Sequence, residues 1–170
     1  MLLDLDGTLI GSDGRVAECV WNAVEAAQKA GIKLAACTGR PAAGVSLKVA
    51  ERLGPRNGHV FQSGALVSDP NGKTINVAAL REAAVLEIVR LARENDYSLE
   101  LYTPNSLYVE RKTKLIEAHA KAIGITPLVT DLQTVARSEP VVRAQWVVPA
   151  QLRAQVEALP IEGVQLSSAT

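Results

Sequence analysis

Near its N-terminus the chain reads Leu3-Asp4-Leu5-Asp6-Gly7-Thr8-Leu9. The run Leu2–Leu5 is apolar except for Asp4, a pattern typical of a buried parallel strand that carries one carboxylate. A buried carboxylate without a partner is costly. Since Asp6 follows at the end of the same strand, we expect two like charges to converge there. Mg²⁺, which prefers oxygen ligands, would stabilise them, so the stretch predicts a metal-binding carboxylate pair.

Two other interpretations apply to an Asp-x-Asp-Gly sequence. A calcium loop counted from Asp4 would need glycine where Leu9 stands and a bidentate Glu where Arg15 stands, so that interpretation fails. An ordinary Asp-Gly turn after a strand stays open as the second interpretation. It leaves unexplained why a carboxylate interrupts the apolar run.

Strand-like and helix-like segments alternate in the first third of the chain. Apolar residues at helical spacing predict a helix over 16–30, with Gly31 as its C-terminal cap. The run 32–37 predicts a second strand, a helix extends to Leu53, and residues 59–61 predict a third strand. This order favours an α/β fold with a Rossmann-like parallel core sheet.

The pattern changes after the third strand. A turn sequence at 69–72 lies between two strand-like runs and predicts a hairpin. We therefore expect two domains, a partial Rossmann-like core at 1–76 and an α+β domain at 77–170. In the second domain the predicted helices cover 80–94, 113–123 and 149–159, and the predicted strands cover 98–102, 107–110, 141–148 and 164–166.

Composition narrows the partners and the compartment. The 170 residues are 48% hydrophobic and 21% charged, as in globular proteins. Lys+Arg and Asp+Glu are 18 each, so the zero net charge predicts neither a nucleic-acid partner nor a membrane partner. No apolar run reaches the length of a transmembrane helix. Cys19 and Cys37 fit no metal or disulfide pattern, which favours a cytoplasmic location.

A second candidate site is the segment Thr38-Gly39-Arg40-Pro41, which follows a predicted strand and precedes a predicted helix. A threonine hydroxyl and free backbone N–H groups at a helix start form an anion site. The alternative is that Thr38 is a plain N-cap. A crossover through the helix at 16–30 places the ends of the first two strands at one sheet edge. A carboxylate pair that faces a phosphate-sized anion site predicts phosphoryl transfer.

The segments Leu3-Asp4-Leu5-Asp6-Gly7-Thr8-Leu9 and Cys37-Thr38-Gly39-Arg40 resemble the first two signature motifs of the haloacid dehalogenase superfamily. Their spacing and Ser63-Gly64-Ala65 most resemble the Cof-like sugar-phosphatase branch, whose type IIB cap follows the third core strand. The family often has Asn where this chain has Ser63. The resemblance covers essentially the whole chain. It implies a Mg²⁺-dependent phosphatase of small phosphorylated metabolites, with sugar phosphates as the expected class.

The resemblance also implies roles for individual residues. Asp4 would be the nucleophile that forms an aspartyl-phosphate, and Asp6 the general acid–base. Asp4 through its carboxylate and Asp6 through its carbonyl would ligate Mg²⁺. Thr38 and Gly39 would bind the phosphoryl oxygens. Substrate contacts are expected from Arg40, Ser63 and Gly64.

Other polar or aromatic residues are expected to pack rather than to react. His119 lies on an apolar helix face, and His59 begins a strand with no acidic or cysteine neighbour in sequence. Tyr102 and Tyr108 are expected to be cross-strand neighbours. The charged run 110–114 is most simply a solvated helix start, with contact to an anionic substrate as the alternative.

Two alternative functions stay open at this point. A phosphomannomutase-like phosphotransferase would use the same phosphoenzyme on Asp4 and differ only in the acceptor. The other alternative is a catalytically silent binding protein or fragment. In the family that the chain resembles, later core strands bring a Lys and an acidic metal motif, which would follow Thr170. We therefore expect these residues to lack the C-terminal part of the core and the first strand to have an open edge.

Overall fold

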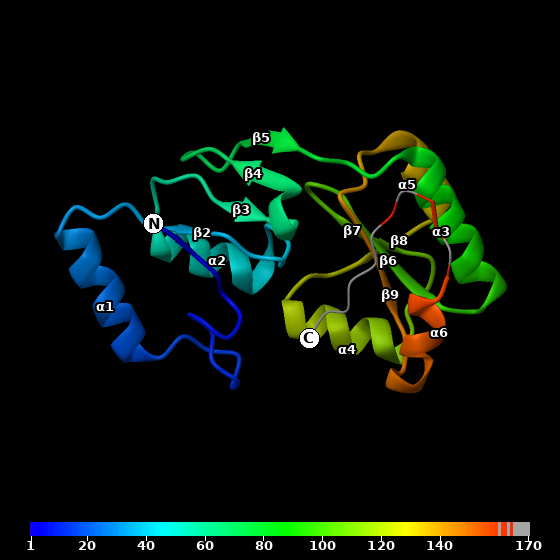
Figure 1. Cartoon of the computed structure of the whole chain (residues 1–170), viewed down its shortest axis with the longest axis horizontal. Coiled ribbons are helices and arrows are strands. Elements are labelled where there is room, and N and C mark those ends of the chain that lie inside the picture. The colour runs from blue at the N-terminus through cyan, green and yellow to red at the C-terminus, as the bar shows by residue number, and fades with distance from the viewer. Residues whose placement is uncertain (160, 163, 165–170) are drawn as a thin grey trace. The chain divides into compact units, whose positions relative to one another are not determined.

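The computed structural model describes residues 1–159, 161, 162 and 164, and it divides the chain into two compact units (Figure 1). The first unit is Met1–Ala78 and the second is Ala79–Thr170. Each unit has its own strands and its own cluster of buried apolar side chains. No helix in the described part of the chain is long and apolar enough to cross a membrane.

The first unit alternates strands and helices in the order that the sequence predicts. Its first elements are β1 (Leu2–Leu3), α1 (Glu18–Lys29), β2 (Ala35–Ala36), α2 (Gly44–Leu53) and β3 (Val60–Phe61). β1 pairs with β2 in parallel. A parallel bridge between Cys37 and Val60 continues this arrangement from β2 to β3. The parallel order of these three strands is therefore confirmed.

The predicted hairpin is also confirmed. A short 3-10 turn, η1 (Gln62–Gly64), leads into the antiparallel strands β4 (Leu66–Ser68) and β5 (Thr74–Val77), which extend from β3. Asp69 stabilises the turn because its Oδ1 accepts hydrogen bonds from the N–H groups of Asn71 at 2.8 Å and Lys73 at 2.9 Å. Gly72 has a φ of +79°, which glycine adopts without steric cost.

His59 ties β2 to the end of α2 in this core. Only 6% of His59 is exposed, and its Nδ1 accepts a hydrogen bond from the Ala36 N–H at 3.1 Å. Its Nε2 therefore carries the proton and donates to the Gly54 carbonyl at 3.2 Å. Burial lowers the pKa of His59, because the neutral ring fits this site and the charged ring does not. The packing role expected for His59 is thus explained by two backbone contacts.

The first strand is less buried than the sequence predicts. Among the described residues β1 pairs only with β2, so its other edge has no strand partner. Leu2 is 62% exposed and Asp4 is also exposed, whereas Leu5 is fully buried. The predicted strand is present as β1, but the prediction that the whole run is buried is wrong: Leu3 is half-buried against the core cluster, and only Leu5, just beyond β1, is fully buried. The physical reason is that a strand of two residues with one neighbour is covered on one side only.

The second unit is an α+β arrangement around one sheet. It contains α3 (Glu82–Glu94), β6 (Ser98–Tyr102), β7 (Leu107–Val109), α4 (Lys114–Ile123), β8 (Leu128–Val129), α5 (Leu132–Ser138), β9 (Arg143–Val147), η2 (Ala150–Leu152) and α6 (Arg153–Glu157). The strand order is β8-β7-β6-β9, with β6 antiparallel to both of its neighbours. β8 and α5 are missing from the sequence prediction, and the predicted helix at 149–159 is split. In the predicted strand at 164–166, Val164 is in neither helix nor strand, and positions 165 and 166 lie outside the described residues.

Side chains of β6 alternate between two faces of this sheet. Leu99 and Leu101 belong to a buried cluster with apolar residues of α3 and α5. Glu100 and Tyr102 therefore lie on the opposite face. Leu101 is paired with Tyr108, and Tyr102 with Leu107. The two tyrosines thus lie on opposite faces and are not the cross-strand neighbours that the sequence predicts, because a shift of one residue reverses the face.

Candidate functional site

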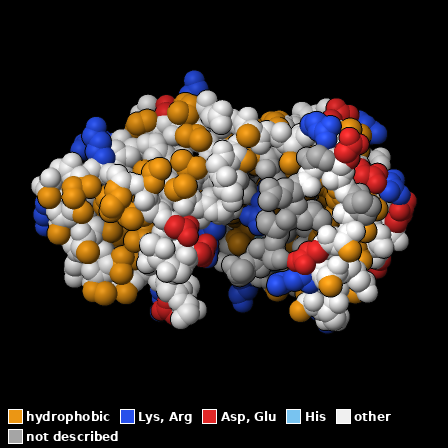
Figure 2. All heavy atoms as spheres, in the orientation of Figure 1, with side chains coloured by type: hydrophobic (Ala, Val, Ile, Leu, Met, Phe, Trp, Pro, Cys, Tyr) orange, Lys and Arg blue, Asp and Glu red, His pale blue; other side chains and the backbone are white. Residues whose placement is uncertain are grey.

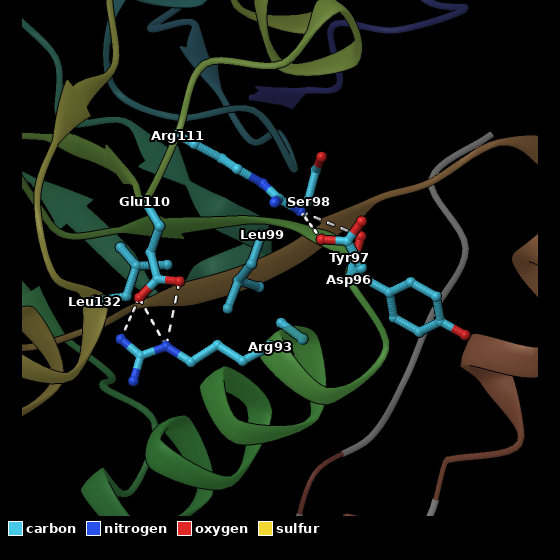
Figure 3. Close-up of a pocket in the computed structure, with 9 residues that line it drawn as sticks. Arg93, Asp96, Tyr97, Ser98, Leu99, Glu110, Arg111 and Leu132 are labelled. Carbon is cyan, nitrogen blue, oxygen red and sulfur yellow. Dashed lines mark hydrogen bonds and ion pairs between the residues drawn. The ribbon is translucent and has the colours of Figure 1, made fainter.

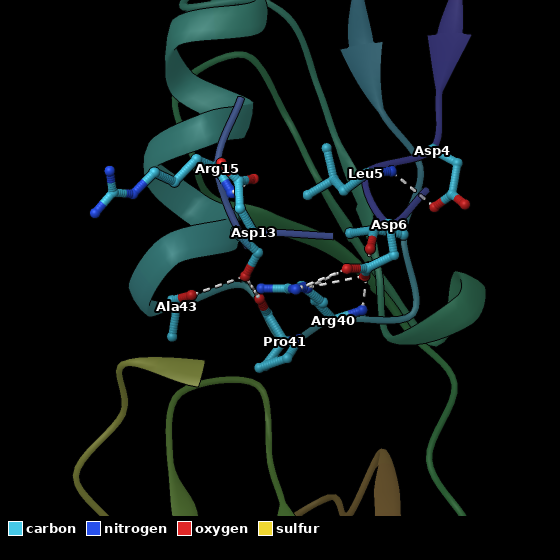
Figure 4. Close-up of polar contacts among 10 residues, drawn as sticks. Asp4, Leu5, Asp6, Asp13, Arg15, Arg40, Pro41 and Ala43 are labelled. Carbon is cyan, nitrogen blue, oxygen red and sulfur yellow. Dashed lines mark hydrogen bonds and ion pairs between the residues drawn. The ribbon is translucent and has the colours of Figure 1, made fainter. Parts of the chain in front are cut away.

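Asp4 and Asp6 follow β1 at its carboxyl end (Figure 4). The Oδ1 of Asp4 accepts a hydrogen bond from the Leu5 N–H at 2.8 Å. The Leu5 carbonyl accepts from the N–H groups of Leu9 at 3.0 Å and Ile10 at 2.7 Å, so the backbone turns back on itself directly after the strand. Asp4 and Asp6 therefore lie where the sequence predicts them, at the carboxyl end of a parallel strand. α/β proteins bind ligands at this end.

The Asp6 carboxylate forms an ion pair with the Arg40 guanidinium. The guanidinium Nε lies 2.8 Å from Oδ2 of Asp6, and Nη2 lies 2.6 Å from Oδ1. These hydrogen bonds raise the pKa of Arg40 above its already high ordinary value. Figure 4 shows the Asp6 side chain directed toward Arg40 and the Asp4 side chain directed away from it. The Asp6 carboxylate thus has a cationic side chain as its partner, and the convergence of Asp4 and Asp6 on one metal ion stays a prediction.

Thr38 follows β2 and is 3% exposed. Its Oγ1 accepts a hydrogen bond from the Arg40 N–H at 3.1 Å, so its own hydroxyl hydrogen is left to donate. α2 begins only at Gly44 and its N-cap is Ala43, without a side-chain cap. The N-cap interpretation of Thr38 is therefore wrong. The segment from Thr38 is also a loop rather than a helix start, because a Thr hydroxyl that binds the backbone nearby favours a turn.

The loop of η1 lies against this segment. The Gln62 N–H donates to the Arg40 carbonyl, and the Ser63 N–H donates to the Thr38 carbonyl, both at 3.0 Å. A Cβ atom on Gly39 would lie 3.2 Å from Ser63 Oγ. The structure therefore brings together the predicted phosphate-binding and substrate residues of both loops: Thr38, Gly39, Arg40, Ser63 and Gly64.

Gln62 is a residue of this loop that the sequence does not indicate. It has a φ of +52° and Ser63 has a φ of +54°, so two residues other than glycine adopt the left-handed conformation in succession. Such strain is common at functional sites. Gln62 is 6% exposed, and its Oε1 is buried without a hydrogen-bond partner among the described residues. In the sequence only Gly64 indicates an unusual backbone here.

The donor chemistry at the end of β1 fits Mg²⁺. The Asp4 carboxylate is exposed, and it accepts a hydrogen bond from the N–H of its own neighbour, Leu5. Together with the Asp6 carbonyl it would offer two oxygen donors, and Mg²⁺ in proteins usually keeps several waters and binds substrate phosphates. In the part of the chain that the structure describes, no group of three or more His, Cys, Asp or Glu side chains could hold a metal ion.

Known proteins that resemble this chain support the family to which the two motifs point. The family model of haloacid dehalogenase-like hydrolases matches residues 1–144. The phosphatase YwpJ of Bacillus subtilis (strain 168) is 29% identical over 106 residues, which are 62% of this chain and 37% of YwpJ. A putative phosphatase of Streptococcus pyogenes serotype M6 is 32% identical over 113 residues, which are 65% of this chain and 42% of that protein. The chain thus spans about two fifths of these relatives.

Solved structures agree on the fold. A haloalkanoate superfamily phosphatase from Bacteroides thetaiotaomicron is 25% identical with a TM-score of 0.70, over 91% of this chain and 57% of that one. A sugar phosphatase of superfamily subclass IIB is 18% identical with a TM-score of 0.73, over 92% of this chain and 61% of that one. Because the sugar phosphatase is only 18% identical to this chain, that likeness shows the fold alone.

Proposed function

Since the chain belongs to the family of haloacid dehalogenase-like hydrolases, in its Cof-like branch, we propose that it acts as a phosphatase of small phosphorylated metabolites, with sugar phosphates as the substrate class. One observation carries the proposal. Asp4 and the Thr38 loop follow two neighbouring parallel strands at the same sheet edge, inside the segment that matches the family. The names of the curated relatives support the reaction class.

In the proposed first step, Asp4 is the nucleophile. Its carboxylate oxygen forms a bond to phosphorus while the bond from phosphorus to the leaving oxygen breaks, which gives an aspartyl-phosphate. The Leu5 N–H holds Oδ1 of Asp4 and leaves Oδ2 for the attack. Exposure of Asp4 supports this role because an anionic phosphate can approach it from solvent.

Asp6 is the proposed general acid and base. It gives a proton to the leaving oxygen in the first step. In the second step it takes a proton from the water that attacks phosphorus and releases Asp4 and inorganic phosphate. Arg40 donates to both oxygens of Asp6, so at least one of these hydrogen bonds has to break when Asp6 reaches the leaving oxygen.

The Thr38 loop is the proposed binding site for the phosphoryl oxygens. The Thr38 hydroxyl can still donate, since its oxygen already accepts from the Arg40 N–H. Gly39 is tightly placed against Ser63, where a side chain would press on the Ser63 hydroxyl. Donors held in this way stabilise charge that develops on the transferred group. Mg²⁺, held by Asp4 and the Asp6 carbonyl, would neutralise part of the phosphate charge.

The cysteines and the net charge support a proposal about compartment and partners. The thiols of Cys19 and Cys37 are free, which supports a reducing compartment, and we place the protein in the cytoplasm. Since the net charge is zero, we propose no nucleic-acid or membrane partner. The proposed partner is a small phosphorylated metabolite. We propose the second unit as the cap that selects it.

A phosphate-release screen tests the proposal. The protein is incubated with a panel of phosphorylated metabolites, sugar phosphates among them, with Mg²⁺ and with EDTA. We expect release of inorganic phosphate that needs Mg²⁺ and that is lost in Asp4→Asn. Absence of release from every substrate, with the metabolites still bound, contradicts the proposal and favours a silent binding protein. Transfer of the phosphoryl group to an added sugar without release of phosphate favours the phosphotransferase.

A further inference from the structure

The second unit contains a small cavity beside the C-terminal end of α3 (Figure 3). Its volume is about 160 Å³. Pockets for drug-sized ligands have roughly 300–1,000 Å³, so this one has room only for a smaller molecule. Three of the side chains that line it are buried and apolar, namely Ala92 of α3, Leu99 of β6 and Leu132 of α5. All three belong to the apolar cluster of this unit, so the cavity borders on the core.

Two ion pairs also line the cavity. Arg93 is paired with Glu110, and Arg111 with Asp96. In Figure 3 the two pairs are seen on either side of Leu99. The charged residues of the lining, as far as the chain is described, are thus two arginines and two acids. Their charges cancel, so the lining matches a ligand without net charge.

The two pairs differ in how firmly they are held. Arg93 donates to Glu110 through Nε at 3.0 Å and to Asp131 through Nη2 at 2.6 Å, so two carboxylates fix it. Arg111 donates to Asp96 through Nη2 alone, and its Nε and Nη1 have no hydrogen-bond partner in the part of the chain that the structure describes. In this second pair 55% of the Arg111 side chain and 82% of the Asp96 side chain are exposed. An ion pair this exposed contributes little to stability, so a ligand can open it at little cost.

The Arg111–Asp96 pair determines which charges a ligand carries. A carboxylate alone would bind Arg111 and leave Asp96 without its partner, and an amine alone would do the reverse. A molecule with both groups exchanges one ion pair for two. Because the two side chains are in direct contact, the charges of the ligand have to lie close together, as they do on the α-carbon of an amino acid. The sequence left contact with an anion open as the alternative for the charged run 110–114, to which Arg111 belongs.

We propose that the cavity binds a small aliphatic α-amino acid in its zwitterionic form. The ligand carboxylate accepts from the Arg111 guanidinium, and its ammonium group donates to Asp96. Its aliphatic side chain packs against Leu99 and Leu132, which removes apolar surface from water. The proposal does not rest on the proposed phosphatase activity, because the cavity uses none of the residues that follow β1 and β2.

The competing explanation is that Arg111 and Asp96 form an ordinary surface pair. Acidic and basic side chains are interspersed on the face of the second unit that Figure 2 shows. The pairs of Arg90 with Glu87 and Glu94 on α3 are of this ordinary kind, and none of these three residues lines the cavity. Arg90→Gln is therefore the matched control for a substitution at Arg111.

Backbone amide NMR with three related probes tests the choice of ligand. L-valine carries both charges, isovalerate lacks the ammonium group and isobutylamine lacks the carboxylate, while all three have the same branched apolar end. We expect saturable shifts for residues 92–99 and 110–111 with L-valine. Isovalerate and isobutylamine should bind about tenfold more weakly or less, since each lacks one charge-assisted contact. Shifts that do not saturate overturn the proposal, and so does binding of isovalerate or isobutylamine as tight as that of L-valine.

Two substitutions test the contacts. Arg111→Gln removes the cation for the ligand carboxylate, and Asp96→Asn removes the anion for its ammonium group. Position 96 has a φ of +56°, which Asn tolerates. Each change should weaken L-valine binding about tenfold or more at an unchanged melting temperature, whereas Arg90→Gln should bind as the unchanged protein does. Equal binding by Arg111→Gln and Arg90→Gln overturns the proposal. Since no readout measures phosphate release, failure of the proposed phosphatase would not affect the result.

Discussion

The guanidinium of Arg40 donates to both carboxylate oxygens of Asp6, at 2.8 Å through Nε and 2.6 Å through Nη2. The two residues are 34 positions apart and meet because they follow the ends of two parallel strands that are neighbours. The pair is partly open to solvent, with 25% of the Arg40 side chain and 55% of the Asp6 side chain exposed. Ion pairs that solvent reaches contribute little to stability. We therefore expect the Asp6–Arg40 pair to affect the reaction more than the free energy of unfolding.

Arg40→Gln tests that expectation. The free energy of unfolding should change by less than about 1 kcal/mol, because solvent reaches the pair and screens it, with 55% of the Asp6 side chain exposed. Phosphatase activity should fall by about tenfold or more, since Gln cannot make a two-point, charge-assisted contact with Asp6 or an anion. Arg90→Gln is the matched control, because Arg90 also forms charge-assisted hydrogen bonds, here to Glu87 and Glu94, but on the exposed face of α3. Equal activity in the two variants would show that Arg40 has no part in the reaction.

Asp4→Asn is expected to abolish turnover with an unchanged fold. The substitution keeps the shape of the side chain and removes the nucleophilic carboxylate. Asp6→Asn should be severe as well, with residual activity strongest for substrates whose leaving group needs little protonation, such as nitrophenyl phosphate. Circular dichroism checks the fold and phosphate release checks the activity. Near-normal release by Asp4→Asn would refute the covalent mechanism.

Stability should depend on pH through His59. Burial lowers the pKa of this ring below its ordinary value of 6.5, so the unfolded chain binds the proton more readily than the folded protein does. The contribution of His59 is therefore complete above about pH 6.5 and is lost as the pH falls below that value. In His59→Asn the dependence of the melting temperature on pH in this window should flatten.

The control for His59 is the other histidine. Asn at position 59 can still accept from the Ala36 N–H through its oxygen, so the fold should survive with a loss of about 1 kcal/mol for the contact to Gly54. His119→Asn should keep the pH dependence that His59 causes. If both variants keep the same slope below pH 6.5, groups other than His59 are responsible for it.

Gly54→Ala should destabilise the first unit. A Cβ atom at this position would lie 2.1 Å from the Leu34 carbonyl oxygen, which also accepts a hydrogen bond from the Asn57 side chain. Since backbone has to move, we expect a loss of about 1–3 kcal/mol or more in urea unfolding. At Gly11 the nearest atom would be a side-chain oxygen of Asp13 at 3.2 Å, which can rotate away. Gly11→Ala should therefore cost less than about 1 kcal/mol.

Local signals predicted most of the elements of both units. α1 ends before Gly31, which has a φ of +80°, and the hairpin turn at 69–72 is closed by Asp69 as such sequences usually are. The signal is weaker at 124–138, where β8 has two residues and α5 seven, too short for periodicity to be recognised. Apolar spacing also could not show that α2 starts at Gly44, because the start depends on how the preceding loop bonds to itself.

By itself the sequence determined the family and the position of the two motifs, since both depend on residues that are close along the chain. Only the tertiary structure decided the partners of their charged groups. Asp6 meets Arg40, Asp4 turns to solvent, and Glu100 is buried against a histidine 19 positions away. Such contacts depend on strand pairing and on which face of a sheet is covered. A shift of one residue in register would reverse them without any change in local pattern.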